Sequence, residues 1–257
     1  MNAFATSRRS FIGTSLVLGA PALLEAPSSL RSLETGSPKP LKLVCVGAHP
    51  DDPESGCAGT LARYAQAGHS VTVVYLTRGQ RGIPGKSLDE AAAIRTGEAQ
   101  SACKLLKAKP MFGSQVDGST EVSKSSLAEI QNLLVAEEPD ILITHWPIDT
   151  HPDHQVASLL AIRAYFSMAH RAQLYCFEVN TGSQSQGFVP NTYVDISAVL
   201  EIKQAALFAH VSQNGQEIWS RHHQAIASFR GREAGVAAAE AFFHLERPNR
   251  ATHLPGV

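Results

Sequence analysis

Two short clusters of histidine and acidic residues carry the side chains that could do chemistry. They are residues 49–52 (HPDD) and residues 151–154 (HPDH). Neighbouring carboxylates repel and raise one another's pKa unless a cation lies between them. The simplest interpretation of the first cluster is a divalent metal ion held by His49 and Asp52, with Asp51 left free to handle protons.

Each cluster lies where a predicted strand gives way to a predicted helix. The flanking segments are residues 43–47 and 56–64 for the first cluster, and residues 140–146 and 156–169 for the second. The carboxyl ends of parallel strands meet at one edge of a sheet, so two loops could supply His49, Asp52 and His154 to one ion. Three ligands and an open position for water suit catalytic zinc better than structural zinc.

The first cluster has two other interpretations. A dinucleotide-binding turn would be glycine-rich, but no GxGxxG motif is present and the acidic residues would repel a phosphate. Alternatively, the acidic residues only cap the helix and form the turn. The second cluster, on a distant strand-to-helix turn, favours the metal site over the cap.

Strand and helix patterns alternate along the rest of the chain. The predicted elements are strands at 70–76, within 108–120, at 173–179 and at 192–196, and helices at 88–107, 123–136, 197–209 and 214–230, with an apolar run at 236–243. This alternation predicts a single α/β domain over residues 41–245, a three-layer α/β/α, Rossmann-like architecture with a mostly parallel sheet.

Composition excludes some classes of function. The formal net charge of −1 shows no nucleic-acid footprint, and the 44% hydrophobic content supports a sizeable core. The four cysteines lack CxxC spacing, which favours packing roles, although disulfides stay open in an oxidising compartment.

The amino-terminal segment is typical of an export signal. Arg8 and Arg9 precede a short apolar run, so residues 1–26 are predicted to be a twin-arginine signal and residues 27–40 a linker. The run is shorter than the about 20 residues that a membrane span needs. We therefore expect a periplasmic or extracellular protein with no stable membrane span after cleavage. The alternative is a disordered tail with a chance arginine pair, and residues 246–257 are predicted to be a loose tail.

The two clusters together resemble those of the PIG-L/LmbE-like family of zinc-dependent de-N-acetylases. The resemblance covers most of residues 41–245. Besides the clusters it includes residues 56–60, residues 76–79, Arg95 with Glu98, residues 193–197 and residues 210–213. Two motifs in the right order and context make the match specific.

The resemblance implies a role for each site residue. It assigns zinc ligation to His49, Asp52 and His154, and the general base to Asp51. It also implies that His151, as an imidazole or imidazolium, stabilises the tetrahedral oxyanion while Asp153 orients and charges it. Arg95 is predicted to contact the substrate, and His210 either lines the pocket or makes a structural hydrogen bond.

Three classes of function follow. The leading prediction is an amidohydrolase, with Zn²⁺ or another divalent ion such as Fe²⁺, that removes an acetyl group from an N-acetylglucosamine-type sugar or a related amide. A serine hydrolase is disfavoured because no GxSxG motif is present. The third class, an exported sugar- or metal-binding protein without turnover, would need neither Asp51 nor His151. The acyl substrate and the oligomeric state stay open.

Overall fold

The computed structural model describes residues 39–169 and 172–246. The predicted signal (1–26), residues 27–38 of the predicted linker and residues 247–257 of the predicted tail lie outside the described residues. No helix within the described ranges is both long enough and apolar enough to cross a membrane.

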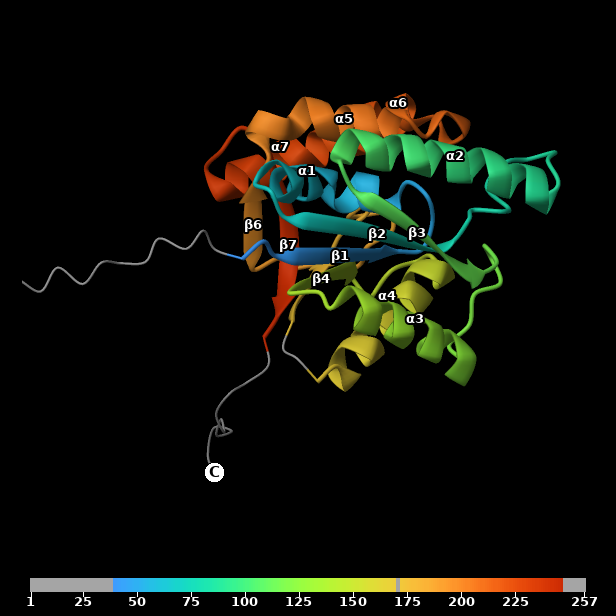
Figure 1. Cartoon of the computed structure of the whole chain (residues 1–257). Helices are drawn as coiled ribbons and strands as arrows, with labels where there is room; N and C mark the ends of the chain where they lie inside the picture. Colours follow the sequence, from blue (N-terminus) through green and yellow to red (C-terminus); the bar gives the residue numbers. More distant parts are fainter. Residues whose placement is uncertain (1–38, 170–171, 247–257) are drawn as a thin grey trace, which may run out of the picture. The chain divides into compact units, whose positions relative to one another are not determined.

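A seven-stranded sheet forms the centre of the domain, in the order β3-β2-β1-β4-β5-β7-β6 (Figure 1). The strands are β1 (Lys42–Gly47), β2 (Ser70–Thr77), β3 (Lys109–Gln115), β4 (Ile141–His145), β5 (Gln173–Phe177), β6 (Thr192–Asp195) and β7 (Ala239–Leu245). The first five are parallel, and β7 pairs antiparallel with both β5 and β6. The predicted mostly parallel α/β architecture is confirmed.

Helices cover both faces of this sheet, which gives the predicted three layers. Figure 1 shows α1, α2, α5 and α7 on one face, and α3 and α4 on the other. The helices are α1 (Asp52–Gln66), α2 (Leu88–Leu106), α3 (Lys124–Glu137), α4 (Pro152–Ser167), α5 (Leu200–Phe208), α6 (Gly215–Ile218) and α7 (Gln224–Ala234). Each face has its own apolar core, one around Leu61 and Phe177 and the other around Leu142 and Leu160.

The central strands bury both of their faces. Five of the six β1 residues are buried, and all five of β4 are, which explains why both segments are almost continuously apolar. The two strands pair directly, with Leu43 opposite Ile141. Both clusters therefore leave the sheet from adjacent strands at the same edge, the usual position of a ligand site in an open α/β sheet.

The alanine-rich run near the carboxyl terminus forms β7, whose Glu240 joins three elements through a buried network. Its carboxylate accepts hydrogen bonds from the backbone N–H groups of Gly59 and Thr60 at 2.8 and 2.7 Å. It also accepts from Thr60 Oγ1 and from Lys203 Nζ, each at 2.6 Å. Lys203 donates in addition to the Ser55 carbonyl at 2.7 Å. Glu240 thus ties β7 to α1 and α5.

Candidate metal centre and active site

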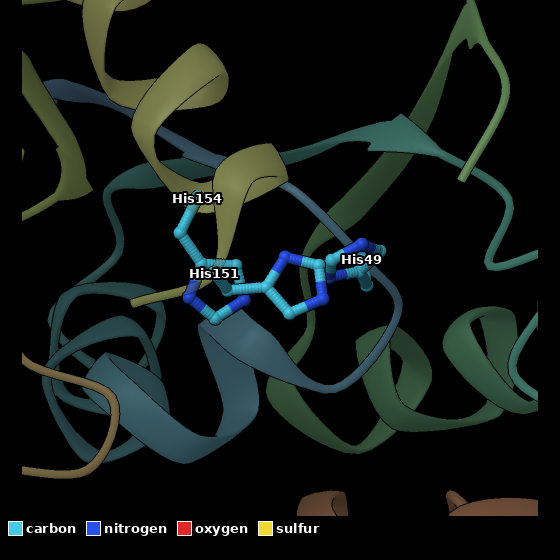
Figure 2. Close-up of side chains that lie close together, drawn as sticks. All are labelled: His49, His151 and His154. Atoms are coloured by element: carbon cyan, nitrogen blue, oxygen red, sulfur yellow. The ribbon is translucent and has the colours of Figure 1, made fainter. Parts of the chain in front are cut away.

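The loops after β1 and β4 meet at the carboxyl edge of the sheet. The ring centroid of His49 lies 4.8 Å from that of His151 and 5.4 Å from that of His154. Figure 2 shows the three rings gathered together, His49 from the loop after β1 and the other two from the start of α4. The sequence prediction that the two loops come together is confirmed.

Asp52 lies between two of these imidazoles. Its Oδ2 is 3.2 Å from His49 Nδ1, and its Oδ1 is 3.2 Å from His154 Nε2. All three side chains are buried, as expected for ligands that hold an ion in a shielded site. The structure therefore brings the three predicted ligands close together, with a carboxylate oxygen facing each imidazole. His49 and Asp52 nevertheless fall in different groups of ligand atoms that could share an ion.

The outer nitrogen of each imidazole faces a second carboxylate. His49 Nε2 lies 3.0 Å from Asp153 Oδ2, and His154 Nδ1 lies 3.2 Å from Asp149 Oδ1. Metal-ligating histidines commonly present their other ring nitrogen to a carboxylate, which fixes the tautomer and the ring orientation. This donor set fits a divalent cation on the inner side of both rings.

Charge in the cluster is balanced by protons when no cation is bound. Burial acts to lower the pKa of His154, but the carboxylates of Asp52 and Asp149 outweigh it and raise that pKa to about 9. The pKa of His49 is likewise raised well above its usual range, against burial, by Asp52, Asp117 and Asp153. Burial works to raise the pKa of Asp52, but the imidazoles of His154 and His49 hold it well below the usual range.

Metal binding is therefore expected to release protons and to weaken as the pH falls. A pKa of about 9 means that His154 is protonated at neutral pH in the metal-free protein, and a cation must displace that proton. The apparent metal affinity should rise as the pH rises through about 9. Calorimetric titration in buffers of different ionisation enthalpy counts the protons released. An affinity that does not change from neutral pH upward would contradict this electrostatic account.

Asp149 lies at the candidate site but was not predicted from the sequence. Its Oδ1 accepts from the His151 backbone N–H at 2.8 Å and faces His154, while its Oδ2 accepts from Ser185 Oγ at 3.2 Å. The carboxylate thus links the second cluster to the loop of residues 180–187, which also pairs with the 148–150 segment through two backbone hydrogen bonds. In the sequence, the position of Asp149 two residues before His151 could have indicated that it lies at the site.

Replacing Asp149 with asparagine is expected to weaken metal binding by about 10- to 100-fold, the usual effect of losing an outer carboxylate partner. The amide keeps the shape of the side chain but removes the charge that faces His154 Nδ1. Competition with a chromogenic chelator measures the affinity. Asp140→Asn is the matched control, because Asp140 is exposed and caps the opposite end of the sheet at the Lys42 N–H. Equal affinities for the two variants would contradict the assigned role.

Asp51 lies beside the cluster without joining it. Among the described residues, the groups whose ligand atoms could share an ion are His49/His151/His154, Asp52/His145/His154 and His49/Asp117/Asp153, and Asp51 belongs to none of them. Its Oδ1 lies 3.2 Å from Arg95 Nη2. Burial raises the pKa of Asp51 against the opposing charge of Arg95, which brings the carboxylate closer to the pKa that suits a general base.

The structure corrects the predicted pairing of Asp153 with His151. The Asp153 carboxylate accepts from the Gly118 N–H and from Thr120 Oγ1, each at 2.7 Å, and its third partner is His49. Only the backbone N–H of Asp153 reaches His151, donating to Nδ1 at 3.2 Å. Asp153 therefore orients His49, because its oxygens are occupied there.

His151 is a neutral imidazole in this arrangement. Burial lowers its pKa, and the nearby charges of His49 and His154 lower it further. Because Nδ1 accepts a backbone hydrogen bond, the single ring proton of the neutral form lies on Nε2. His151 can thus offer an N–H to a developing oxyanion without being an imidazolium.

Arg95 and His210, the two predicted substrate contacts, are both buried. Arg95 is 3% exposed and bonds to Asp51 and to backbone carbonyls. His210 is 0% exposed, with Nε2 3.5 Å from Glu54 Oε2, and Glu54 also accepts from Tyr75. The prediction that His210 lines the pocket is wrong, because the α5-to-α6 segment folds it beneath the site.

Two further residues near the cluster were not predicted to take part. Asp117 Oδ1 lies 3.3 Å from His49 Nε2, and its Oδ2 accepts from the Arg81 N–H at 3.0 Å. His145, at the end of β4, accepts from the Ala48 N–H at 3.0 Å and stacks on His154 with centroids 4.3 Å apart. Burial, together with the charge of His154, lowers the pKa of His145 to about 4, and its Nε2 also lies 3.4 Å from Asp52 Oδ2.

The chain is similar to known proteins in both sequence and fold. The family model of PIG-L, a GlcNAc-PI de-N-acetylase, matches residues 44–165. The diacetylchitobiose deacetylase of Thermococcus kodakarensis is 30% identical over 217 residues, covering 77% of this chain and 81% of that protein. The N,N'-diacetylchitobiose deacetylase structure from Pyrococcus horikoshii superposes with a TM-score of 0.73 at 27% identity, covering 80% and 84% of the two chains. A 4-oxalmesaconate hydratase of Pseudomonas putida is 26% identical over 78% of this chain and 85% of its own. Matched along this length in sequence and in fold, the chain belongs to the PIG-L de-N-acetylase family.

Proposed function

We propose that this protein is a zinc-dependent amidohydrolase that removes the N-acetyl group from an N-acetylglucosamine-type sugar or glycoconjugate. The observation that carries the proposal is the position of Asp51: a partly buried carboxylate held by Arg95, next to a cluster that fits a divalent cation but outside it. A site that only binds a metal ion does not need a carboxylate placed beside the ligands to take a proton from water. Deacetylases in the same family at 30% and 27% identity support the reaction class.

The residues of this chain divide the work of hydrolysis. Bound by His49, Asp52 and His154, a divalent ion would supply a Lewis acid that polarises the amide and acidifies water. Asp51 accepts the proton of the attacking water, and returns it to the departing amine as the C–N bond breaks. The Nε2–H of His151 donates to the carbonyl oxygen as negative charge develops there. Asp153 and Asp149 hold the rings of His49 and His154 in place.

An acetate-release assay across N-acetylated saccharides tests the proposal. Chelation is expected to abolish turnover, and zinc to restore it, while Fe²⁺ added in the absence of oxygen identifies any preference between the two metals. Hydration of 4-oxalmesaconate, measured in parallel, covers the reaction of the hydratase relative. Metal-independent acetate release, or hydration without acetate release, would overturn the assignment.

We also propose that residues 1–26 direct export by the twin-arginine route, with residues 41–245 forming the enzyme domain. Arg8 and Arg9 before the apolar run support this location, and a glycan outside the cytoplasm would then be the substrate. Fractionation of cells that express a tagged full-length chain tests it. The Arg8→Lys/Arg9→Lys variant should accumulate in the cytoplasm, and unchanged export of that variant would contradict the proposal.

A further inference from the structure

Arg95, on α2, binds the turn that carries Asp51. Its Nη2 donates to the Pro50 carbonyl at 2.5 Å and lies 3.2 Å from Asp51 Oδ1. Its Nη1 donates to the Gly79 carbonyl at 3.5 Å. Both terminal nitrogens of the guanidinium thus have protein partners, while its buried Nε has no hydrogen-bond partner among the described residues.

The contact with Pro50 controls the backbone of the next residue. Asp51 has φ 115°, a conformation that costs a non-glycine residue free energy and persists only where the surroundings hold it. The peptide before Asp51 is held through the Pro50 carbonyl by Arg95. The peptide after it is held through the Asp51 carbonyl, which accepts from the Ser55 N–H at 2.8 Å. Both peptide planes that flank Asp51 are thus fixed, one of them by a side chain from α2.

Two glycines of the loop after β2 leave just enough room for this guanidinium. A Cβ added at Gly79 or at Gly82 would lie 2.3 Å from Arg95 Nη1, far inside contact distance. The space that these two glycines leave for the guanidinium is called the slot below. The Gly82 carbonyl accepts from Gln213 Nε2 at 3.0 Å, and this hydrogen bond fixes the backbone on one side of the slot. The backbone of this loop therefore packs directly against the Arg95 guanidinium.

We propose that Arg95 is a positioning residue that fixes the backbone and the carboxylate of Asp51, and that Gly79 and Gly82 form the slot that orients it. This inference rests on the proposed role of Asp51 as the general base. Lysine cannot replace the arginine, because one ammonium lacks the planar fork that reaches the Pro50 carbonyl, Asp51 and Gly79 together.

The Arg95→Lys variant tests the inference. We expect kcat to fall by about 100-fold, since a displacement of about 1 Å in a catalytic group has an effect of that size. KM and zinc content should stay near those of the wild type, and a crystal structure should show Asp51 leaving its positive φ. An increase in KM with kcat unchanged would mean that Arg95 contacts the substrate, and would overturn the inference. So would an unaltered Asp51 backbone in the crystal.

The Gly82→Ala variant tests the slot without removing the arginine. Gly82 is not among the positive-φ glycines, so the added methyl changes space rather than backbone preference. We expect the same selective loss of kcat, and the double variant with Arg95→Lys should be little worse than either single variant, because both act through one contact. Gly97→Ala is the matched control, since a Cβ there meets nothing within 4 Å.

Different results would contradict the proposed function and the positioning role of Arg95. If the proposed function is wrong, the wild type lacks deacetylase activity or Asp51→Asn retains it. If only the positioning role is wrong, the wild type is active and Asp51→Asn is inactive, but Arg95→Lys and Gly82→Ala keep wild-type kcat. Melting temperature and zinc content of each variant separate a folding defect from a catalytic one, and a Gly82→Ala protein that does not fold leaves the decision to Arg95→Lys.

Discussion

The Asp51→Asn variant is expected to bind metal as the wild type does and to lose about 1,000-fold in kcat, within the range for removal of a general base. Asparagine has nearly the same shape and tolerates positive φ better than most residues, so the turn at Asp51 should survive. Its amide oxygen can still face Arg95, but the amide cannot take a proton from water. Single-turnover acetate release and zinc analysis of the same preparation measure both properties.

The control for Asp51→Asn is Asp89→Asn, an exposed acidic residue in the first turn of α2. It removes the same charge from the same side of the domain and should keep full activity. An Asp51→Asn enzyme within a few-fold of the wild-type rate would show that another group handles the proton. Loss of zinc along with activity would instead place Asp51 among the ligands.

Glu240→Ala is expected to cause the largest loss of stability, about 3–5 kcal/mol in the free energy of unfolding, as for a buried ion pair that loses one partner. Lys203 would be left buried with only the Ser55 carbonyl, and the N–H groups of Gly59 and Thr60 would lose their acceptor. Urea denaturation followed by circular dichroism measures the change.

Two further variants show whether the loss of stability in Glu240→Ala comes from the buried network. Glu138→Ala removes an exposed partner of Lys42 and should cost at most about 1 kcal/mol. Replacing the pair together, as Glu240→Gln with Lys203→Met, should cost less than Glu240→Ala, because no buried ammonium is left unpaired. A loss for Glu240→Ala as small as that for Glu138→Ala would contradict the network described for β7.

The features that were predicted most accurately from the sequence are those that depend on neighbouring residues in the chain. Each cluster is contiguous with a strand and a helix, so parallel-sheet geometry sufficed to bring His49 and His154 together. Contacts that depend on long-range packing could not be predicted from the sequence. Asp117, which follows β3, contacts His49. Asp153 faces His49 because its carboxylate accepts hydrogen bonds from Gly118 and Thr120. Burial of His210 likewise depends on Glu54, which is 156 positions away along the chain.

The position of β7 shows a similar limit. An alanine-rich run of this length carries little β-branched or alternating signal, and its place between β5 and β6 depends on Glu240 meeting α1 and Lys203. The helical prediction for residues 214–230 was correct in type but ended four residues before the end of α7 at Ala234, and a π-helical turn at Trp219–His223 separates α6 from α7. Such a local change in helix type has no sequence signature of its own here.

The hydrogen bond from Ser185 to Asp149 has a consequence for engineering this enzyme. The 180–187 segment lies next to the second cluster through its backbone hydrogen bonds to residues 148–150, so it is a target for changing the range of accepted amide substrates. Exchanging it would also disturb the carboxylate behind His154, so a graft selected for a new donor would tend to lose its cofactor during purification. Libraries that keep Ser185 and vary its neighbours would separate the two properties.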